Sequence, residues 1–402
     1  MTTAPAFEPY TAAFAADPYP VYAALREGAP VFRSEALGMV LLARYADIRR
    51  ALTDRRLGRE PVPRPDGVPP PGPAPGELPC YDRWVRVNLL ETEGDTHGRL
   101  RRLLGTALAP RRIAALAGRV GRIAAELVSR LERGRAIDFV TQVAEPLPVT
   151  VIAELFGWPR EESGRLRPWA ADIVRLYEKD ASAEDRQRAE TAAREFGERL
   201  SALIDERRRR PENDLISTLS ARLDAPDGLS RDELIANAML LLNAGHEATV
   251  NAAGNGLLAL LRHPDAAAAV SAAPELVHSA VEEILRWDAP LHLFHRYARE
   301  ALAIGGVSLG RGELIGLLYG SGNRDPDAFP DPDRFDVART PNRHLSFGGA
   351  THFCLGAPLA RLELRTLFAA LLEKLPSLTL VEPPRYRTGL VFRGLERLVV
   401  SA

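Results

Sequence analysis

The chain has 402 residues, of which 46% are hydrophobic, 52 are Lys or Arg and 53 are Asp or Glu. This composition supplies a large apolar core, and the near balance of charge gives no reason to expect nucleic acid as a partner. Two cysteines give no disulfide framework and are typical of a reducing compartment. No stretch approaches the roughly 20 apolar residues of a membrane span, and residues 1–10 have no apolar signal core. We therefore expect a cytoplasmic protein without a membrane partner.

The first hundred residues are expected to hold short, mixed elements. Residues 18–26 have a helical pattern, and residues 31–32 and 39–42 are typical of short strands. Between Pro61 and Pro79 the chain has nine prolines and three glycines, which exclude regular helix or sheet. This stretch is either a loop that covers a substrate or a connector, and both interpretations stay open.

Helical periodicity dominates from residue 96 to about residue 261, and the last of these helices is the longest. It is expected to begin at Ser230-Arg-Asp-Glu233, which forms a capping box, and to end at Arg262, before a His-Pro pair. Because it is apolar nearly all round, it should be buried. Its middle, Asn243-Ala-Gly-His-Glu-Ala-Thr249, carries polar groups that are costly in a buried helix unless they are used or satisfied.

After Pro290 the pattern changes to strand and turn, and from Asn323 to Ser346 it is irregular. The next segment reads Phe347-Gly-Gly-Ala-Thr-His-Phe-Cys-Leu-Gly-Ala-Pro-Leu-Ala-Arg361 and leads into a helix expected to run toward Lys374. Backbone N–H groups at a helix N-terminus stabilise a thiolate, and glycines on both sides let the backbone approach a flat ligand. A lone cysteine in an apolar run is otherwise a small buried hydrophobe. A zinc site is excluded because Cys354 has no second cysteine pair.

This cysteine segment resembles the cysteine-ligand loop of the cytochrome P450 superfamily, and the resemblance extends from about residue 17 to residue 396. It implies a mainly α fold with small β-sheets, a single domain over residues 1–402, and a long buried central helix over haem b, iron protoporphyrin IX. Cys354 would be the iron ligand. One departure is Ala350, where the family usually has glycine. The cofactor-binding residues that the resemblance implies are His97, Arg101, Arg296, Phe347, Gly348, His352, Cys354 and Gly356.

The central helix matches the family pattern at Ala244, Gly245 and Glu247, but Ala248 stands where the family has threonine. A hydroxyl follows at Thr249, and because one residue turns a helix by about 100° it cannot simply replace the missing group. Activation of O2 needs two protons, and a positioned general acid is typically worth ~10²–10⁴ in rate. We therefore hypothesise that ordered water, or a hydroxyl or amide of the substrate, completes a relay from Glu247. The alternative is that Glu247 only satisfies backbone carbonyls.

A second match is Glu283-Ile-Leu-Arg286, on a helix where positions three apart share one face. The resemblance implies that Arg334 completes a buried ionic cluster, whose role would be to hold the irregular segment before the cysteine loop. An isolated Glu/Arg pair of this spacing is more often a solvated surface pair.

The substrate pocket follows only from the resemblance and from helical spacing. Asn243 and His292 would make it partly polar, unless each is a satisfied core residue. The implied lining residues are Leu240, Asn243, Ala244, Leu291, His292, Phe294 and Val391.

The resemblance implies a haem-thiolate monooxygenase that hydroxylates or epoxidises a small organic molecule, such as an intermediate of natural-product biosynthesis. Electrons would come from a ferredoxin and its reductase, and Arg99, Arg102, Arg111 and Arg112 would form a docking face unless they are simply solvated. Oxidative coupling or desaturation without oxygen insertion is an alternative within the same cofactor class. A non-catalytic haem-binding sensor is an alternative of another class, and a helical protein without haem is a third.

Overall fold

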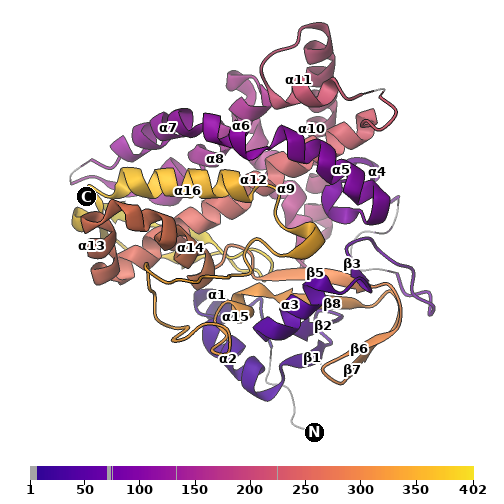
Figure 1. The fold of residues 1–402 in the computed structure, drawn as a ribbon, viewed down its shortest axis with the longest axis horizontal. Helices are drawn as coiled ribbons and strands as arrows, with labels where there is room; N and C mark the ends of the chain where they lie inside the picture. Colours follow the sequence, from indigo (N-terminus) through magenta and orange to yellow (C-terminus); the bar gives the residue numbers. More distant parts are fainter. Residues whose placement is uncertain (1–6, 70–73, 75, 133, 224) are drawn as a thin grey trace.

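The computed structural model describes residues 7–69, 74, 76–132, 134–223 and 225–402. Figure 1 shows a large helical part and a smaller part built on a mixed sheet, with α1 and α2 on the sheet side. The α-helices are α1 (Ala12–Ala16), α2 (Tyr19–Gly28), α3 (Tyr45–Thr53), α4 (Pro79–Trp84), α5 (Gly94–Ala107), α6 (Pro110–Ala115), α7 (Ala117–Ser129), α8 (Pro146–Phe156), α9 (Leu166–Val174), α10 (Ala183–Arg209), α11 (Leu215–Ser220), α12 (Arg231–Arg262), α13 (Pro264–Ala272), α14 (Val277–Trp287), α15 (Tyr319–Gly322) and α16 (Ala357–Leu371).

Short turns of 3₁₀- and π-helix connect several of these helices: η1 (Leu89–Glu91), η2 (Val140–Ala144, the π turn), η3 (Arg160–Arg165), η4 (Arg175–Tyr177), η5 (Pro274–Leu276), η6 (Ala350–His352) and η7 (Leu375–Ser377). The strands are β1 (Val31–Ser34), β2 (Met39–Leu42), β3 (Leu57–Gly58), β4 (Ala136–Asp138), β5 (Leu293–Ala298), β6 (Leu302–Ile304), β7 (Val307–Leu309), β8 (Leu314–Leu318), β9 (Thr379–Leu380), β10 (Arg385–Tyr386), β11 (Leu395–Arg397) and β12 (Val399–Ser401).

The largest sheet joins the two ends of the sequence. Its strand order is β1-β2-β8-β5-β3, and β2 runs parallel to β8 with Met39 opposite Leu314. The other pairs in this sheet are antiparallel. The strands predicted at residues 31–32 and 39–42 are confirmed as β1 and β2. The pairing of β5 with β8 fixes the position of Phe294, a residue of the candidate site.

The long helix predicted from the capping box is confirmed as α12. The Ser230 side chain accepts a hydrogen bond from the Glu233 amide, and the Glu233 carboxylate accepts one from the Ser230 amide. A Cβ at Gly256 would lie 2.7 Å from both Ile284 and Phe368, so α12 packs closely against α14 and α16. Helices α4, α8, α9 and α10 also contact α12, which makes it the buried axis of the helical part.

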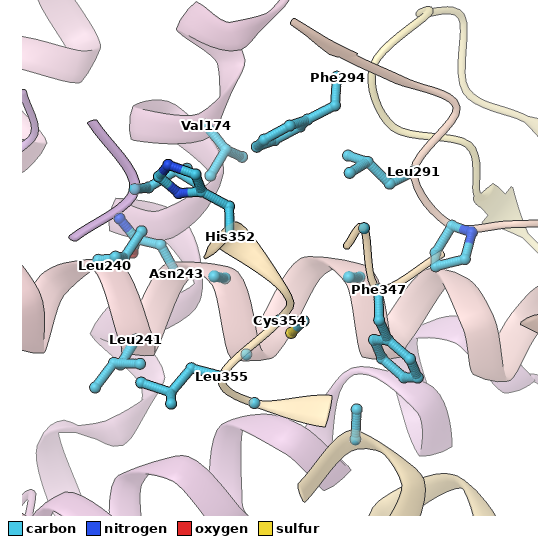
Figure 2. Close-up of a pocket in the computed structure, with 18 of the residues that line it drawn as sticks. Val174, Leu240, Leu241, Asn243, Leu291, Phe294, Phe347, His352, Cys354 and Leu355 are labelled. Carbon is cyan, nitrogen blue, oxygen red and sulfur yellow. The ribbon is translucent and has the colours of Figure 1, made fainter. Parts of the chain in front are cut away.

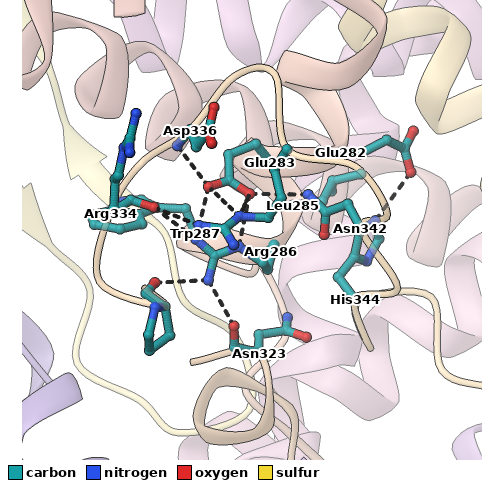
Figure 3. A network of polar contacts seen from close by, with 12 residues as sticks. Glu282, Glu283, Leu285, Arg286, Trp287, Asn323, Arg334, Asp336, Asn342 and His344 are labelled. Carbon is teal, nitrogen blue, oxygen red and sulfur yellow. Dashed lines mark hydrogen bonds and ion pairs between the residues drawn. The ribbon is translucent and has the colours of Figure 1, made fainter. Parts of the chain in front are cut away.

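Glu283 and Arg286 of α14 hold the irregular segment 323–346 in place (Figure 3). Both side chains are fully buried, and the Nε and Nη2 atoms of Arg286 each donate to the Glu283 carboxylate at 2.8 Å. The remaining hydrogen bonds of the pair all go to the irregular segment. Arg286 donates to the carbonyls of Asn323, Pro332 and Arg334, and Glu283 accepts from the Asp336 amide and from Asn342.

The expected third member of this cluster needs correction. The Arg334 side chain is exposed and points away from Glu283 in Figure 3, and only its carbonyl oxygen takes part. The second guanidinium beside Glu283 belongs to Arg339, whose Nε lies 3.3 Å and 3.2 Å from the two carboxylate oxygens. An irregular segment has no repeating pattern that shows which side chains face inward. The resemblance therefore assigned the contact with Glu283 to Arg334 instead of Arg339.

Candidate active site

A cavity lies between the middle of α12 and the loop before α16 (Figure 2). Figure 2 shows Cys354 on that loop, which passes in front of α12, the helix that carries Leu240, Leu241 and Asn243. Segments distant in the sequence, among them α4, α5, β5 and the chain around residue 391, close the remaining walls. Of the residues predicted for the site, the lining includes His97, Arg101, Leu240, Asn243, Ala244, Ala248, Thr249, Leu291, Phe294, Phe347, Gly348, His352, Cys354, Gly356 and Val391.

Backbone contacts hold the cysteine loop closed on itself. The amide of Cys354 donates to the carbonyl of Phe347 at 2.9 Å, and the amide of Gly348, at a φ of +66°, donates to Leu345 at 2.7 Å. Burial raises the pKa of the Cys354 thiol, whereas the N–H groups of Gly356 and Ala357 oppose that rise. The positive charges of Arg101 and Arg361 also oppose it. A bound cation would therefore find a site already arranged for a thiolate.

A second acid of α14 supports the start of this loop. Glu282 accepts hydrogen bonds from both Nε and Nη2 of Arg361, at 2.8 and 2.7 Å, and from His344 at 3.2 Å. The guanidinium of Arg361 lies 4.5 Å from the centre of the Phe347 ring. Glu282 is not predictable from the sequence, because its partners lie far away in the chain and no local pattern joins them.

The departure at Ala350 has a conformational cost. Ala350 has a φ of +54°, in the left-handed region where a Cβ is strained, and its side chain is exposed. A glycine at this position would relieve the strain and so stabilise the folded state by about 1–2 kcal/mol. Glycine also makes the unfolded chain more flexible, which offsets about 0.4–1 kcal/mol of this gain. We expect Ala350→Gly to raise the free energy of unfolding by about 0.5–1 kcal/mol, measured by thermal or urea unfolding. Ala360→Gly, inside α16, is the control and should lower it.

Two histidines and an arginine meet beside the cysteine loop. The rings of His97 and His352 lie 4.4 Å apart, and the Nη2 of Arg101 donates to the Phe353 carbonyl at 2.8 Å. Burial and the neighbouring His352 lower the pKa of His97 to about 4, so this imidazole is neutral at pH 7. Its buried Nε2 has no partner among the described residues, and a buried donor or acceptor left unpaired is costly. A ligand group with oxygen atoms would satisfy it.

Glu93, which the sequence analysis did not find, anchors the same corner. Its Oε1 accepts from the backbone amide of Arg59 at 2.6 Å and lies 2.9 Å from the Nε2 of His352. Burial acts to raise its pKa, but these two hydrogen bonds and the charge on His352 outweigh burial and lower the pKa of Glu93 to about 2. An ionised Glu93 fixes the orientation of the His352 ring.

Arg296 lies behind the cavity wall. Its side chain is buried, its Nη1 donates to the His295 carbonyl at 3.0 Å, and its guanidinium lies 5.3 Å from the Phe294 ring. Arg59, next to Arg296, does line the cavity; it also donates to the His295 carbonyl and forms an ion pair with Glu91. Arg59 follows a two-residue strand, where no periodicity marks which side chains face inward.

Ala248, Thr249 and Glu247 face in different directions. Ala248 and Thr249 line the cavity, and the Thr249 hydroxyl is hydrogen-bonded to Glu363 of α16. Burial raises the pKa of Glu363 to about 8, although this hydrogen bond lowers it. Glu247 does not reach the lining: its Oε1 accepts from the Nη1 of Arg387 at 2.6 Å. The turn of about 100° per residue therefore separates the Thr249 hydroxyl from the position of Ala248.

His292 is a core residue and not part of the predicted pocket wall. Its Nδ1 lies 3.0 Å from the Tyr22 hydroxyl, and its ring fills the space beside Gly320, where a Cβ would lie 2.7 Å from the same nitrogen. The backbone of His292 donates to Val391, and an extended chain alternates its side chains, so Leu291 faces the cavity. Asn243 does line the cavity, and its buried Oδ1 has no partner among the described residues.

The described residues of the proline-rich stretch lie away from the cavity. A Cβ at Gly312 would lie 2.6 Å from both the Val62 carbonyl and the Arg64 side chain, so this part packs against the turn between β7 and β8. Residues 70–73 and 75 lie outside the described residues, and none of the described residues 61–77 lines the cavity. The walls that sequence analysis missed come from either side of the stretch and from the α9–α10 connection: Arg59, Trp84, Val85, Asn88, Leu89, Tyr177 and Lys179.

Comparison with known proteins places this fold and cavity in a family. The family model described as Cytochrome P450 matches residues 166–386. The 6-deoxyerythronolide B hydroxylase of Saccharopolyspora erythraea is 39% identical over 410 residues, covering 100% of this chain and 99% of that protein. A solved structure of P450BioI with an acyl carrier protein ligated to hexadec-9Z-enoic acid has a TM-score of 0.90 and 32% identity, over 98% of this chain and 100% of that chain.

A myxobacterial cytochrome P450 in complex with myristic acid has a TM-score of 0.88 and 34% identity, over 97% of this chain and 98% of that chain. The chain belongs to the cytochrome P450 family. Within that family it is a monooxygenase of secondary metabolism, and it acts on a small molecule with electrons from a redox partner. Among the described residues, no helix has the length and apolar character needed to span a membrane.

The residues present fit a haem. Cys354 offers a sulfur to the cavity, and Gly348 and Gly356 place no side chain beside it. His97 presents an unpartnered buried nitrogen and Arg101 a guanidinium, which together suit the propionates of a haem. This donor set satisfies polar atoms that would otherwise stay buried and unpaired.

Proposed function

We propose that this monooxygenase binds haem b with Cys354 as the iron ligand and hydroxylates or epoxidises an intermediate of natural-product biosynthesis. The observation that carries this proposal is that the Cys354 sulfur shares one cavity with the small residues Ala244, Gly245 and Ala248 of α12. When bound, a haem-thiolate supplies the activation of O2. The small side chains leave room for O2 and substrate next to that group.

His97, Arg101 and His352 would hold the haem propionates. A neutral His97 donates through one ring nitrogen, and Arg101 adds a charged donor. Arg296 does not line the cavity, so we assign it to the charge of the wall behind Phe294. Glu93 keeps His352 in place.

The proton supply would pass through Glu247. Its partner Arg387 is about one-third exposed, so the Glu247 carboxylate lies one side chain from solvent. Arg387 also lies 3.8 Å from Glu145, which pairs with the exposed Arg167. Since Ala248 has no hydroxyl to offer, ordered water or a hydroxyl or amide of the substrate would carry the proton from Glu247 into the cavity.

Substitution at position 248 tests this relay. Valine has the shape of threonine without its hydroxyl, so Ala248→Val controls for the added bulk. We expect the fraction of consumed NADPH that yields product to be at least about twofold higher in Ala248→Thr than in Ala248→Val, because the hydroxyl adds a proton donor. Product and hydrogen peroxide would both be measured. Equal yields in the two variants would mean that a hydroxyl at this position takes no part in proton delivery.

The electron donor would be a ferredoxin with its reductase. Arg99 is held by Glu233 and by the Gly228 carbonyl, so it does not belong to a free docking face. Arg102, Arg111 and Arg112 are exposed near the α5–α6 turn and would supply that face.

The relatives differ in substrate: one is named as a hydroxylase of 6-deoxyerythronolide B, and another binds a fatty acyl carrier protein. For this chain, the many apolar residues of the cavity lining favour a substrate with a large apolar part.

Two measurements test the proposal. The purified protein should show the strongly red-shifted absorption band of a reduced carbonyl haem-thiolate complex. With surrogate ferredoxin and reductase, a screen of natural-product intermediates should find substrate-dependent NADPH consumption and a product that has gained oxygen. Haem without NADPH consumption above background would favour the sensor interpretation. A product that has lost hydrogen but gained no oxygen would favour coupling or desaturation, the interpretation that Ala248 keeps open.

A further inference from the structure

Lys179 is a cation in the cavity wall without a counter-ion. It lies in the segment that joins η4 to α10, its side chain is partly buried, and it is one of only two lysines in the chain. Burial lowers the pKa of Lys179 to about 8, and no acidic side chain offsets that effect. Within the described residues, no hydrogen bond or ion pair reaches its ammonium group. Such a group is costly to bury unless a ligand pairs with it.

The surroundings of Lys179 are positive. The charges of Arg59, Lys179 and Arg296 all act, together with burial, to lower the pKa of His295 well below its usual value, so this imidazole is neutral. Arg59 already has a counter-ion in Glu91. A neutral His295 cannot repel a cation and cannot neutralise an anion. Lys179 is therefore the lining cation at this end of the cavity whose charge has no acidic partner among the described residues.

The haem propionates have their own partners. His97, Arg101 and His352 stand together beside the cysteine loop, whereas Lys179 belongs to the group around His295 and Arg59. Both groups face the same cavity, and Glu93 joins them because it contacts His352 and the Arg59 amide. Lys179 is therefore free to pair with a ligand anion other than the propionates.

We propose that Lys179 binds a carboxylate of the substrate and so sets which carbon of an apolar chain lies at the oxidation site. This proposal rests on the proposed function, because the substrate is taken to occupy the haem-facing cavity. The apolar walls from α4, α12 and β5 would hold the hydrocarbon body. An ammonium–carboxylate pair in a partly dry wall is a strong, charge-assisted contact. It also excludes neutral analogues, since binding them leaves Lys179 unpaired.

Decanoic acid and decanamide form a suitable probe pair, because they differ in charge at one end and share the same chain. Equilibrium dialysis of the haem-loaded protein at pH 7 would give both dissociation constants. We expect the wild type to bind the acid at least about tenfold more tightly than the amide, and Lys179→Gln to lose that preference. Lys374→Gln removes the same charge from the other lysine, whose Nζ donates to the Leu131 carbonyl outside the cavity, and should keep the preference.

Three results would overturn the proposal. The first is a wild type with no preference for the acid, including one that binds neither probe; this result does not depend on how any variant folds. The second is a correctly folded Lys179→Gln protein that keeps the preference. The third is a Lys179→Gln protein that loses haem while keeping the preference, which would assign Lys179 to a propionate. Failure of the proposed function is separate: it would appear as a wild-type protein without haem, whatever its acid preference in dialysis.

Discussion

Cys354→Ser is expected to reduce substrate oxidation to background and to remove the red-shifted band of the reduced carbonyl complex. A serine hydroxyl stays protonated near neutral pH, whereas the loop places two backbone N–H groups and two guanidinium groups to favour a thiolate once iron is bound. The variant would keep the contacts of His97 and Arg101 with the propionates. We therefore expect its haem content, relative to wild type, to fall less than its activity. Absorption spectra, haem content and product formation measure the three effects separately.

Cys80→Ser is the matched control for this substitution. Cys80 is the other cysteine of the chain, is only partly buried, and lies in α4 with its backbone amide bonded to Glu190. Its side chain does not line the cavity. We expect the Cys80 variant to keep the wild-type spectrum and turnover. A Cys354→Ser protein that also kept both would show that the sulfur in this loop does not bind iron, and the proposed function would fail with it.

What the sequence predicted well was local or repetitive. The capping box at Ser230 and the 3.6-residue period fixed α12, and the glycines around Cys354 fixed the loop before α16. Each of these features is written in neighbouring residues, so no tertiary contact was needed to recognise it. The same reasoning placed Leu240, Asn243, Ala244 and Ala248 on the cavity face of one helix.

What it predicted poorly depends on contacts between distant segments. His292 satisfies Tyr22, which lies in α2, and Glu93 reaches His352 across most of the chain. No local pattern separates such a buried core residue from a lining residue. Lys179 is a different case. Lysine is rare in a chain whose other cations are almost all arginine, and this was visible in the sequence. The structure was needed to show that Lys179 lines the cavity without an acidic partner.

Glu283→Ala is expected to be the most destabilising of the substitutions considered for this chain. It leaves the fully buried guanidinium of Arg286 without a counter-ion, and losing one partner of such a pair costs about 3–5 kcal/mol. It also removes the acceptor for the Asp336 amide and for Asn342 in the irregular segment. Because that segment leads directly into the cysteine loop, the variant should unfold at lower urea concentration and be recovered with little haem.

Two arginine variants distinguish the observed cluster, in which the Arg339 side chain contacts Glu283, from the cluster that the resemblance implies, in which Arg334 does. Arg339→Ala removes the second guanidinium from Glu283 and should lower the free energy of unfolding by about 1–3 kcal/mol. Arg334→Ala keeps the carbonyl that Arg286 and Arg339 use and alters only an exposed side chain, so it should stay within about 0.5 kcal/mol of wild type. If Arg334→Ala were the more damaging variant, the side chain placed outside the cluster would belong inside it. A fully haem-loaded and stable Glu283→Ala protein would remove the structural role of the cluster altogether, since an alanine cannot anchor the segment that presents Cys354.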